Sequence, residues 1–177
     1  MVPLLRRISV LLFVLVGISL ALTSAAGAQS SAPGAVAFGR GDYVRAARLL
    51  GPAAQLGNAK AQAMLGFMFE HGLGVPQDYG VAAVWYKQAA EQNYASAQYS
   101  LGLLYDKGFG VPQNEVLAHK WLNLAAAAAG PSQRENFLRL RDAVASKMTH
   151  SSIVEAQLLA REWTIRVHHD PLALQPK

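Results

Sequence analysis

The residues that could do chemistry in this 177-residue chain are few, and they form no recognisable catalytic arrangement. There is no cysteine, which excludes disulfides, thiolate catalysis, cysteine zinc sites and a lipidated N-terminal cysteine. The signatures G-x-S-x-G, S-x-x-K and H-E-x-x-H and the P-loop are absent as well. We therefore expect no catalytic residue, no metal site and no cofactor.

The five histidines lie at positions 71, 119, 150, 168 and 169. His168-His169 could touch a metal together with Asp170, but adjacent residues on a helix do not share a face, which favours a plain tail pair. Glu70-His71 recurs 36 residues later as Asp106-Lys107. An acid followed by a base in both places indicates a surface feature and not a catalytic dyad.

The N-terminus has the three parts of a secretory signal peptide. Arg6-Arg7 precedes the uncharged apolar run Ile8–Leu22, and Ala26-Gly27-Ala28 fits the cleavage site. The 15-residue run is short for a membrane-spanning helix, which needs about 20 residues. We expect cleavage after Ala28 and a periplasmic protein, with secretion, or an uncleaved inner-membrane tether, as the alternatives.

The charge of the chain argues against a nucleic-acid partner. Removal of residues 1–28 takes away two of the 16 basic residues and no acidic ones, so the net charge falls from +5 to +3. Acidic residues are interleaved with the remaining basic ones, which leaves no continuous basic stripe for a phosphate backbone. We expect a protein or peptide partner, no nucleic acid, and membrane contact only through the signal segment before cleavage.

A repeat of 36 residues organises the rest of the chain. Residues 59–94 align without a gap on residues 95–130; for example, Leu65-Gly66 recurs as Leu101-Gly102, and Trp85 as Trp121. Each copy also contains a G-x-G-V-P-Q segment, at 72–77 and 108–113. A partial copy precedes them from Asp42, and its first half is missing from the pattern.

Each copy predicts two helices joined by a glycine-rich loop. The first, helix A, has apolar residues at fourfold spacing and ends at the glycines. The second, helix B, begins after Asp42, Asp78 or Asn114, which share one phase of the repeat and are good N-cap residues. Gly66 and Gly102 lie inside helix A, where glycine costs about 1 kcal/mol against alanine. We expect a closely crossing helix there, with Ala82 and Ala118 opposite and the tryptophans filling the wedge between helices.

These residues resemble the Sel1-like repeat family, a relative of the tetratricopeptide repeats. Both complete copies follow its A-x-x-x-L-G and G-x-G-V pattern and its A-x-x-W-x-x-x-A-A segment. Where the family pattern has tyrosine, the two copies have Phe69 and Tyr105, and where it has aspartate, the second copy has Asn114. The resemblance covers about residues 42–130. It implies an all-α, right-handed superhelical solenoid whose members act as adaptors for other proteins.

The ends of the chain complete the expected domain organisation. One apolar face carries Phe137 and Val144, and another carries Ala156, Ala160 and Trp163, which predicts a capping helical hairpin outside the 36-residue phase. The expected segments are a signal peptide at 1–28, a disordered tail at 29–41, an N-terminal half-repeat at 42–58, repeats at 59–94 and 95–130, a C-terminal hairpin at 131–168 and a tail at 169–177.

By analogy with related superhelices, helix A lines the concave surface, and its phases that are free of packing would bind the partner. The expected binding residues are Lys60, Phe67, Glu70, His71, Ser96, Tyr99, Leu103, Asp106 and Lys107. Burial of Phe67 and Leu103 under a neighbouring unit is the alternative for those two. The mixture of aromatic, aliphatic and charged side chains is typical of a peptide groove.

The favoured function is a non-catalytic adaptor or scaffold of the bacterial cell envelope. Some exported relatives with such repeats are linked to penicillin binding or β-lactam hydrolysis, so a cell-wall or β-lactam hydrolase is one alternative. The missing S-x-x-K motif argues against it. A membrane-tethered scaffold that retains its signal is the other alternative.

Overall fold

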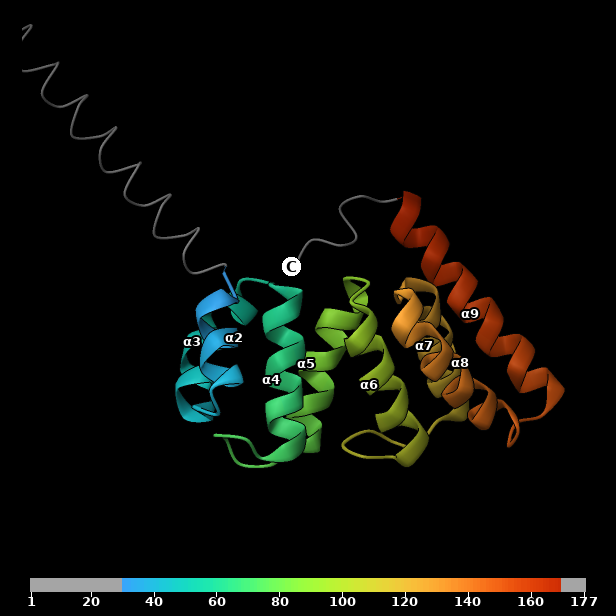
Figure 1. The fold of residues 1–177 in the computed structure, drawn as a ribbon. Helices are drawn as coiled ribbons and strands as arrows, with labels where there is room; N and C mark the ends of the chain where they lie inside the picture. Colours follow the sequence, from blue (N-terminus) through green and yellow to red (C-terminus); the bar gives the residue numbers. More distant parts are fainter. Residues whose placement is uncertain (1–29, 170–177) are drawn as a thin grey trace, which may run out of the picture.

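The computed structural model describes residues 30–169. Within them the chain forms helices and no strand, and the helices stack side by side into a solenoid (Figure 1). This confirms the all-α repeat fold. The expected signal peptide and residues 170–177 lie outside the described residues. The helices are α2 (Ala32–Gly39), α3 (Tyr43–Gln55), α4 (Ala59–His71), α5 (Tyr79–Glu91), α6 (Ala95–Lys107), α7 (Glu115–Ala128), α8 (Pro131–Ala145) and α9 (His150–His169).

Three N-caps at one phase of the repeat start the B helices α3, α5 and α7, as the sequence predicts. The side chains of Asp42, Asp78 and Asn114 accept hydrogen bonds from backbone N–H groups three residues on, at 3.2, 2.9 and 2.9 Å. Such a bond satisfies one of the donors that a helix N-terminus leaves unpaired. At the other end of α4 and α6, Gly72 and Gly108 adopt the left-handed conformation that ends a helix.

A glycine in each helix A lies against one large side chain of the following helix B. A Cβ atom at Gly34, Gly66 or Gly102 would lie 2.5, 2.7 or 2.8 Å from the nearest side-chain atom of Leu50, Tyr86 or Leu122, respectively. These three side chains follow one another at intervals of 36 residues and are almost completely buried. The expected close crossing is therefore present. At Gly102 the carbonyl oxygen of Ala118 would lie 3.2 Å from the Cβ atom, as we had expected of Ala118, but the nearest atoms belong to Leu122, and at Gly66 they belong to Tyr86 and not to Ala82.

Helix α2 corrects the sequence interpretation of the N-terminus. We assigned residues 29–41 to a disordered tail and considered the first half of the N-terminal copy missing, and both assignments are wrong over Ala32–Gly39. This segment is helix A of a third unit, because Gly34 contacts Leu50 as Gly66 contacts Tyr86. The unit was hidden because its loop is four residues shorter and lacks the G-x-G-V-P-Q segment.

The second glycine of each G-x-G loop joins one unit to the previous one. Gly74 lies against the backbone of Tyr43 and Val44, and Gly110 lies against that of Tyr79 and Gly80, with φ near +69° at both glycines. A side chain would be strained by this conformation and would collide with the neighbouring helix start. The loops therefore fix the spacing between successive units.

Two glutamines at one phase of the repeat add polar ties between units. The Nε2 atoms of Gln62 and Gln98 donate to the carbonyls of Ala54 and Ala90, at 3.0 and 3.2 Å. Each bond joins the start of helix A to the last turn of the preceding helix B, whose carbonyls have no partner within the helix. Both glutamines are buried, although a search for apolar spacing passes over them.

The C-terminal helices end the stack in a different way. Helix α8 begins at Pro131, 36 residues after α6, so this helix keeps the phase that we had considered lost. Leu138 takes the place of the crossing glycine in α8. Helix α9 packs on α7 and hardly on α8, whereas α5 and α7 pack on their own helix A. Trp163 of α9 meets Trp121 edge to face at 6.1 Å.

Filling the glycine crossing is expected to destabilise the fold. The Gly66→Ala methyl group would push on the Tyr86 ring, whose hydroxyl is bound to Glu70 at 2.6 Å and resists displacement. Overpacking costs ~1–3 kcal/mol and exceeds the ~1 kcal/mol gain in helix propensity. We expect urea unfolding to show a lower free energy of unfolding for Gly66→Ala.

The matched control is Gly39→Ala at the end of α2, where a Cβ atom would meet no atom within 4 Å. This variant is expected to raise the free energy of unfolding by up to ~1 kcal/mol. Equal effects of the two substitutions would show that the crossing is not close.

Candidate functional site

The inner surface of the solenoid is formed by the A helices. Helix α4 touches both α2 and α6, whereas the B helices α3, α5 and α7 touch one another less. The A helices are thus closer together, and the stack curves towards them. Residues at spacing i, i+4, i+7 share a face of a helix, so Lys60, Phe67 and His71 of α4 lie in one row. The corresponding row of α6 holds Ser96, Leu103 and Lys107.

The row on α4 is open to solvent and centres on an aromatic pair. Lys60, Phe67 and His71 are exposed, and Phe67 has 39% of its surface accessible. The rings of Phe67 and His71 stack at 4.1 Å, and Phe38 of α2 meets Phe67 edge to face at 5.9 Å. The Nδ1 atom of His71 lies 3.0 Å from the carbonyl oxygen of Phe67, which holds the imidazole over the ring. Phe67 is therefore supported from one side and available on the other.

The row on α6 is partly open. Ser96 is exposed, Leu103 is half-buried, and the Lys107 side chain is 57% exposed. Leu103 lies at the repeat position of Phe67, so an aromatic and an aliphatic side chain stand side by side on neighbouring A helices. These two apolar surfaces, with Lys60 and Lys107 around them, form the accessible part of the surface that the sequence predicts.

Glu70 is bound within the protein. Its Oε2 atom accepts a 2.6 Å hydrogen bond from the hydroxyl of Tyr86, the large side chain at the glycine crossing. Burial raises the pKa of Tyr86, and the hydrogen bond to Glu70 raises it further, so the phenol keeps its proton and remains a donor. Glu70 is half-buried, and one of its two carboxylate oxygens is occupied by this internal hydrogen bond.

Asp106 corrects our expectation of an open charged position, because only 5% of its side chain is exposed. Its two carboxylate oxygens lie 2.9 Å from Nζ of Lys147 and 3.1 Å from Nζ of Lys107. Desolvation raises the pKa of Asp106, but the hydrogen bonds from the two lysines outweigh it and bring the pKa below its usual range. Lys147, between α8 and α9, has no counterpart in the repeat, so nothing in the pattern pointed to it.

Tyr99 also serves packing. Its ring stacks on Phe137 of α8 at 4.4 Å, and it is half-buried against the clusters that hold α8 on α7. Tyr99 therefore holds α8 on the repeats, whereas we had expected its ring to contact the partner.

The structure thus separates the nine expected residues into an open group and a group bound within the fold. The open group is Lys60, Phe67, His71, Ser96, Leu103 and Lys107.

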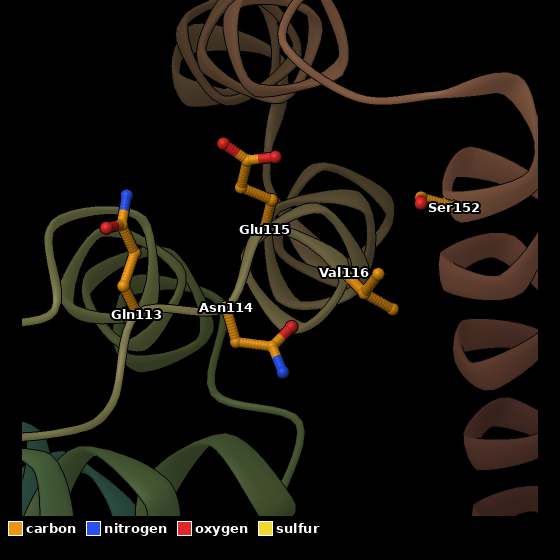
Figure 2. A pocket seen from close by; sticks show the side chains of 5 residues that line it. All are labelled: Gln113, Asn114, Glu115, Val116 and Ser152. Atoms are coloured by element: carbon orange, nitrogen blue, oxygen red, sulfur yellow. The ribbon is translucent and has the colours of Figure 1, made fainter.

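A hollow lies between the starts of α7 and α9. It has a volume of about 370 Å³ and is lined by Gln113, Asn114, Glu115, Val116 and Ser152. Figure 2 shows Val116 and Ser152 facing each other across the gap, while Asn114 and Glu115 point in opposite directions. The polar groups do not converge on one point, so the hollow has no arrangement for chemistry. Among residues 30–169 no group of three histidine or acidic side chains could hold a metal ion.

No helix in the described part of the chain is long and apolar enough to cross a membrane.

The repeats identify the family. The profile described as Sel1 repeat matches residues 34–58, 59–94 and 95–129, more than half of the chain. The chain belongs to the Sel1 repeat family. The Sel1 match at 34–58 includes most of α2, in agreement with the third helix A in the structure. Sel1 repeat proteins are usually scaffolds that bind other proteins, and their fold is generally non-catalytic.

Two solved structures show the same architecture. One is the crystal structure of c5321, described as a protective antigen present in uropathogenic Escherichia coli strains and displaying an SLR fold. It has 29% identity and a TM-score of 0.70, and the match covers 81% of this chain and 30% of that one. The other is the crystal structure of a Sel1 repeat protein from Oxalobacter formigenes. It has 39% identity and a TM-score of 0.52, and the match covers 55% of this chain and 40% of that one. The chain thus spans less than half the length of either. No curated protein matches the sequence.

The Asp106 ion pairs are expected to stabilise the protein in a pH-dependent way. Since the pKa of Asp106 is lower in the folded protein than in the unfolded chain, its contribution is present above about pH 4 and disappears as the pH falls through the folded pKa. Asp106→Asn should therefore unfold at lower urea concentration than wild type at pH 7, and the difference should shrink as the pH falls through the lowered pKa of Asp106. Glu135→Gln, at an exposed site in α8, is the control and should match wild type at pH 7.

Proposed function

We propose that this Sel1 repeat protein is a non-catalytic adaptor whose concave surface binds an acidic protein segment with an apolar anchor. The main support is the state of the surface charges. The two carboxylates expected there are bound internally, Glu70 to Tyr86 and Asp106 to two lysines. Lys60 remains exposed, and Lys107 and Lys147 share one carboxylate between two ammonium groups. Three lysines and two acids thus give a formal charge of 3 − 2 = +1 around the apolar side chains, and the exposed ammonium groups are more accessible than the two carboxylates.

The apolar part of the surface suits a single anchor residue. Phe67, stacked on His71, and the half-buried Leu103 lie at the same repeat position on adjacent helices. An aromatic or aliphatic side chain of the partner would cover both and be fixed by the surrounding packing. Carboxylates beside that anchor would face Lys60 and Lys107, and attraction of this kind increases the association rate and selects against basic partners.

A peptide selection would test the proposal. We expect a phage-displayed library of random helical peptides, selected on the purified protein, to yield sequences rich in Asp and Glu with one large apolar residue. Binding of the selected peptides should weaken at least tenfold for Lys60→Glu or Phe67→Ala. A charge reversal produces such a loss when the salt bridge is central to the complex.

The matched control is Lys87→Glu, the same charge reversal on α5, where the side chain is 59% exposed. It should leave peptide binding unchanged. If Lys60→Glu and Lys87→Glu weaken binding equally, the concave surface is not the site.

We also propose that the protein is exported and works in the periplasm, with cleavage after Ala28. The basic, apolar and small-residue segments at the N-terminus support this proposal. Expression of the full chain in a Gram-negative host, followed by N-terminal sequencing of the periplasmic fraction, should show Gln29 as the first residue. Recovery of a membrane-bound protein that begins at Met1 would instead indicate a retained tether.

A further inference from the structure

Helix α9 carries a row of exposed apolar side chains. Val154, Leu158 and Ile165 are 39%, 51% and 46% exposed, and the exposed Arg161 lies in the same row. The opposite face of the helix is buried on α7 through Ala156, Ala160 and Trp163. In Figure 1 the helix lies at the outer end of the described part of the chain, and no other helix among residues 30–169 lies beyond it.

The row is open because α9 lacks the partner that every other B helix has. Helices α3, α5 and α7 cover one face with their own helix A, at the crossing made by Gly34, Gly66 or Gly102. The corresponding place in α8 holds Leu138, and α9 packs on α7 instead of α8. Among the described residues, no other helix therefore covers the face of α9 that carries Val154, Leu158 and Ile165.

The spacing of the row is self-complementary. From Val154 to Leu158, Arg161 and Ile165 the steps are four, three and four residues, so the row reads the same from both ends. A second α9 laid antiparallel would place Val154 opposite Ile165 of the second copy. Leu158 would then lie opposite the aliphatic stem of Arg161 of the second copy, which can cover apolar surface while its charged end stays in water.

Charge favours the same arrangement. Glu155 and Glu162 are exposed and flank Leu158 at three residues before and four residues after it. The guanidinium of Arg161 of the second copy would therefore lie between these two carboxylates. A parallel arrangement would instead set Arg161 against its own copy, and like charges at such a contact are unfavourable.

We propose that two copies of this protein associate through α9, antiparallel and related by a twofold axis near Leu159 and Ala160. The contact is isologous, so it closes as a dimer and does not extend into a filament. It uses the outer end of the solenoid and leaves both concave surfaces accessible. A dimer of this kind could engage two copies of a segment at once and gain avidity, although the dimer itself does not depend on the proposed function.

The mass of the purified exported protein in solution tests the proposal. Sedimentation equilibrium at 1–100 μM is expected to give twice the mass of the chain at the upper end. Leu158→Asp should raise the dimer dissociation constant at least tenfold and leave circular dichroism and melting temperature unchanged, because the side chain is exposed. Val84→Asp, at a 56% exposed position on α5, is the control and should remain dimeric.

Arg161→Glu is a second variant, and it should also weaken the dimer at least tenfold by placing a carboxylate beside Glu155 and Glu162. It keeps the test decisive if Leu158→Asp fails to fold. A monomer at 100 μM would overturn the proposal and would show that another molecule, or none, covers the row. A dimer unaffected by both variants would also overturn it.

The orientation can be measured because the chain has no native cysteine. Protein with Val154→Cys mixed with protein carrying Ile165→Cys should be joined efficiently by a short bismaleimide. Val154→Cys alone should not, since its two copies would be separated by ~16 Å along the helix axis at 1.5 Å per residue. Efficient linking of Val154→Cys to itself would indicate a parallel pair and contradict the model of association.

Discussion

The close crossing of two helices within each unit is the constraint on which the solenoid depends. Gly34, Gly66 and Gly102 let helix B approach helix A so closely that one large side chain fills the contact. A glycine inside a helix costs about 1 kcal/mol, and the burial of a leucine- or tyrosine-sized side chain offsets it with ~1.5–3 kcal/mol. The crossing sets the distance between the two helices of a unit. Gly74 and Gly110 then set the distance between units through their backbone contacts.

The identity of the side chain at the crossing also decides how the acid near the end of helix A is hydrogen-bonded. In one unit it is Tyr86, whose hydroxyl reaches the carboxylate of Glu70. In the next unit Leu122 takes its place and has no hydroxyl to offer. The acid at the repeat position of Glu70 is Asp106, which is paired with Lys107 and with Lys147 from the connection between α8 and α9. The two solutions differ in charge: the lysines offset the charge of Asp106, whereas the Tyr86 hydroxyl occupies one oxygen of the Glu70 carboxylate and adds no positive charge beside it.

The sequence predicted the parts of the fold that repeat and missed the parts that do not. The N-caps and the glycine loops recur at 36 residues, and each has a local physical role, so their positions could be found without a structure. Helix α2 was missed because its loop is shorter and the signature residues are absent. The bond of Asp106 with Lys147 joins residues 41 positions apart, and the stacking of Tyr99 on Phe137 joins the last clear repeat to a helix without its signature. No local pattern carries such pairs, and they decide which surface residues are free.

The end of the stack and the open face of α9 have one physical cause. The position of the close-crossing glycine in α2, α4 and α6 holds Leu138 in α8, and a leucine there leaves less room for the close approach of a following helix. Helix α9 therefore turns to α7, where Trp163 and Ala160 join the cluster around Trp121 and close the core. A helix can cover the core with only one face, so the apolar residues on its other face stay exposed. Exposure of that row is thus a consequence of how the solenoid is terminated, and its self-complementary spacing makes a second copy the partner that fits it best.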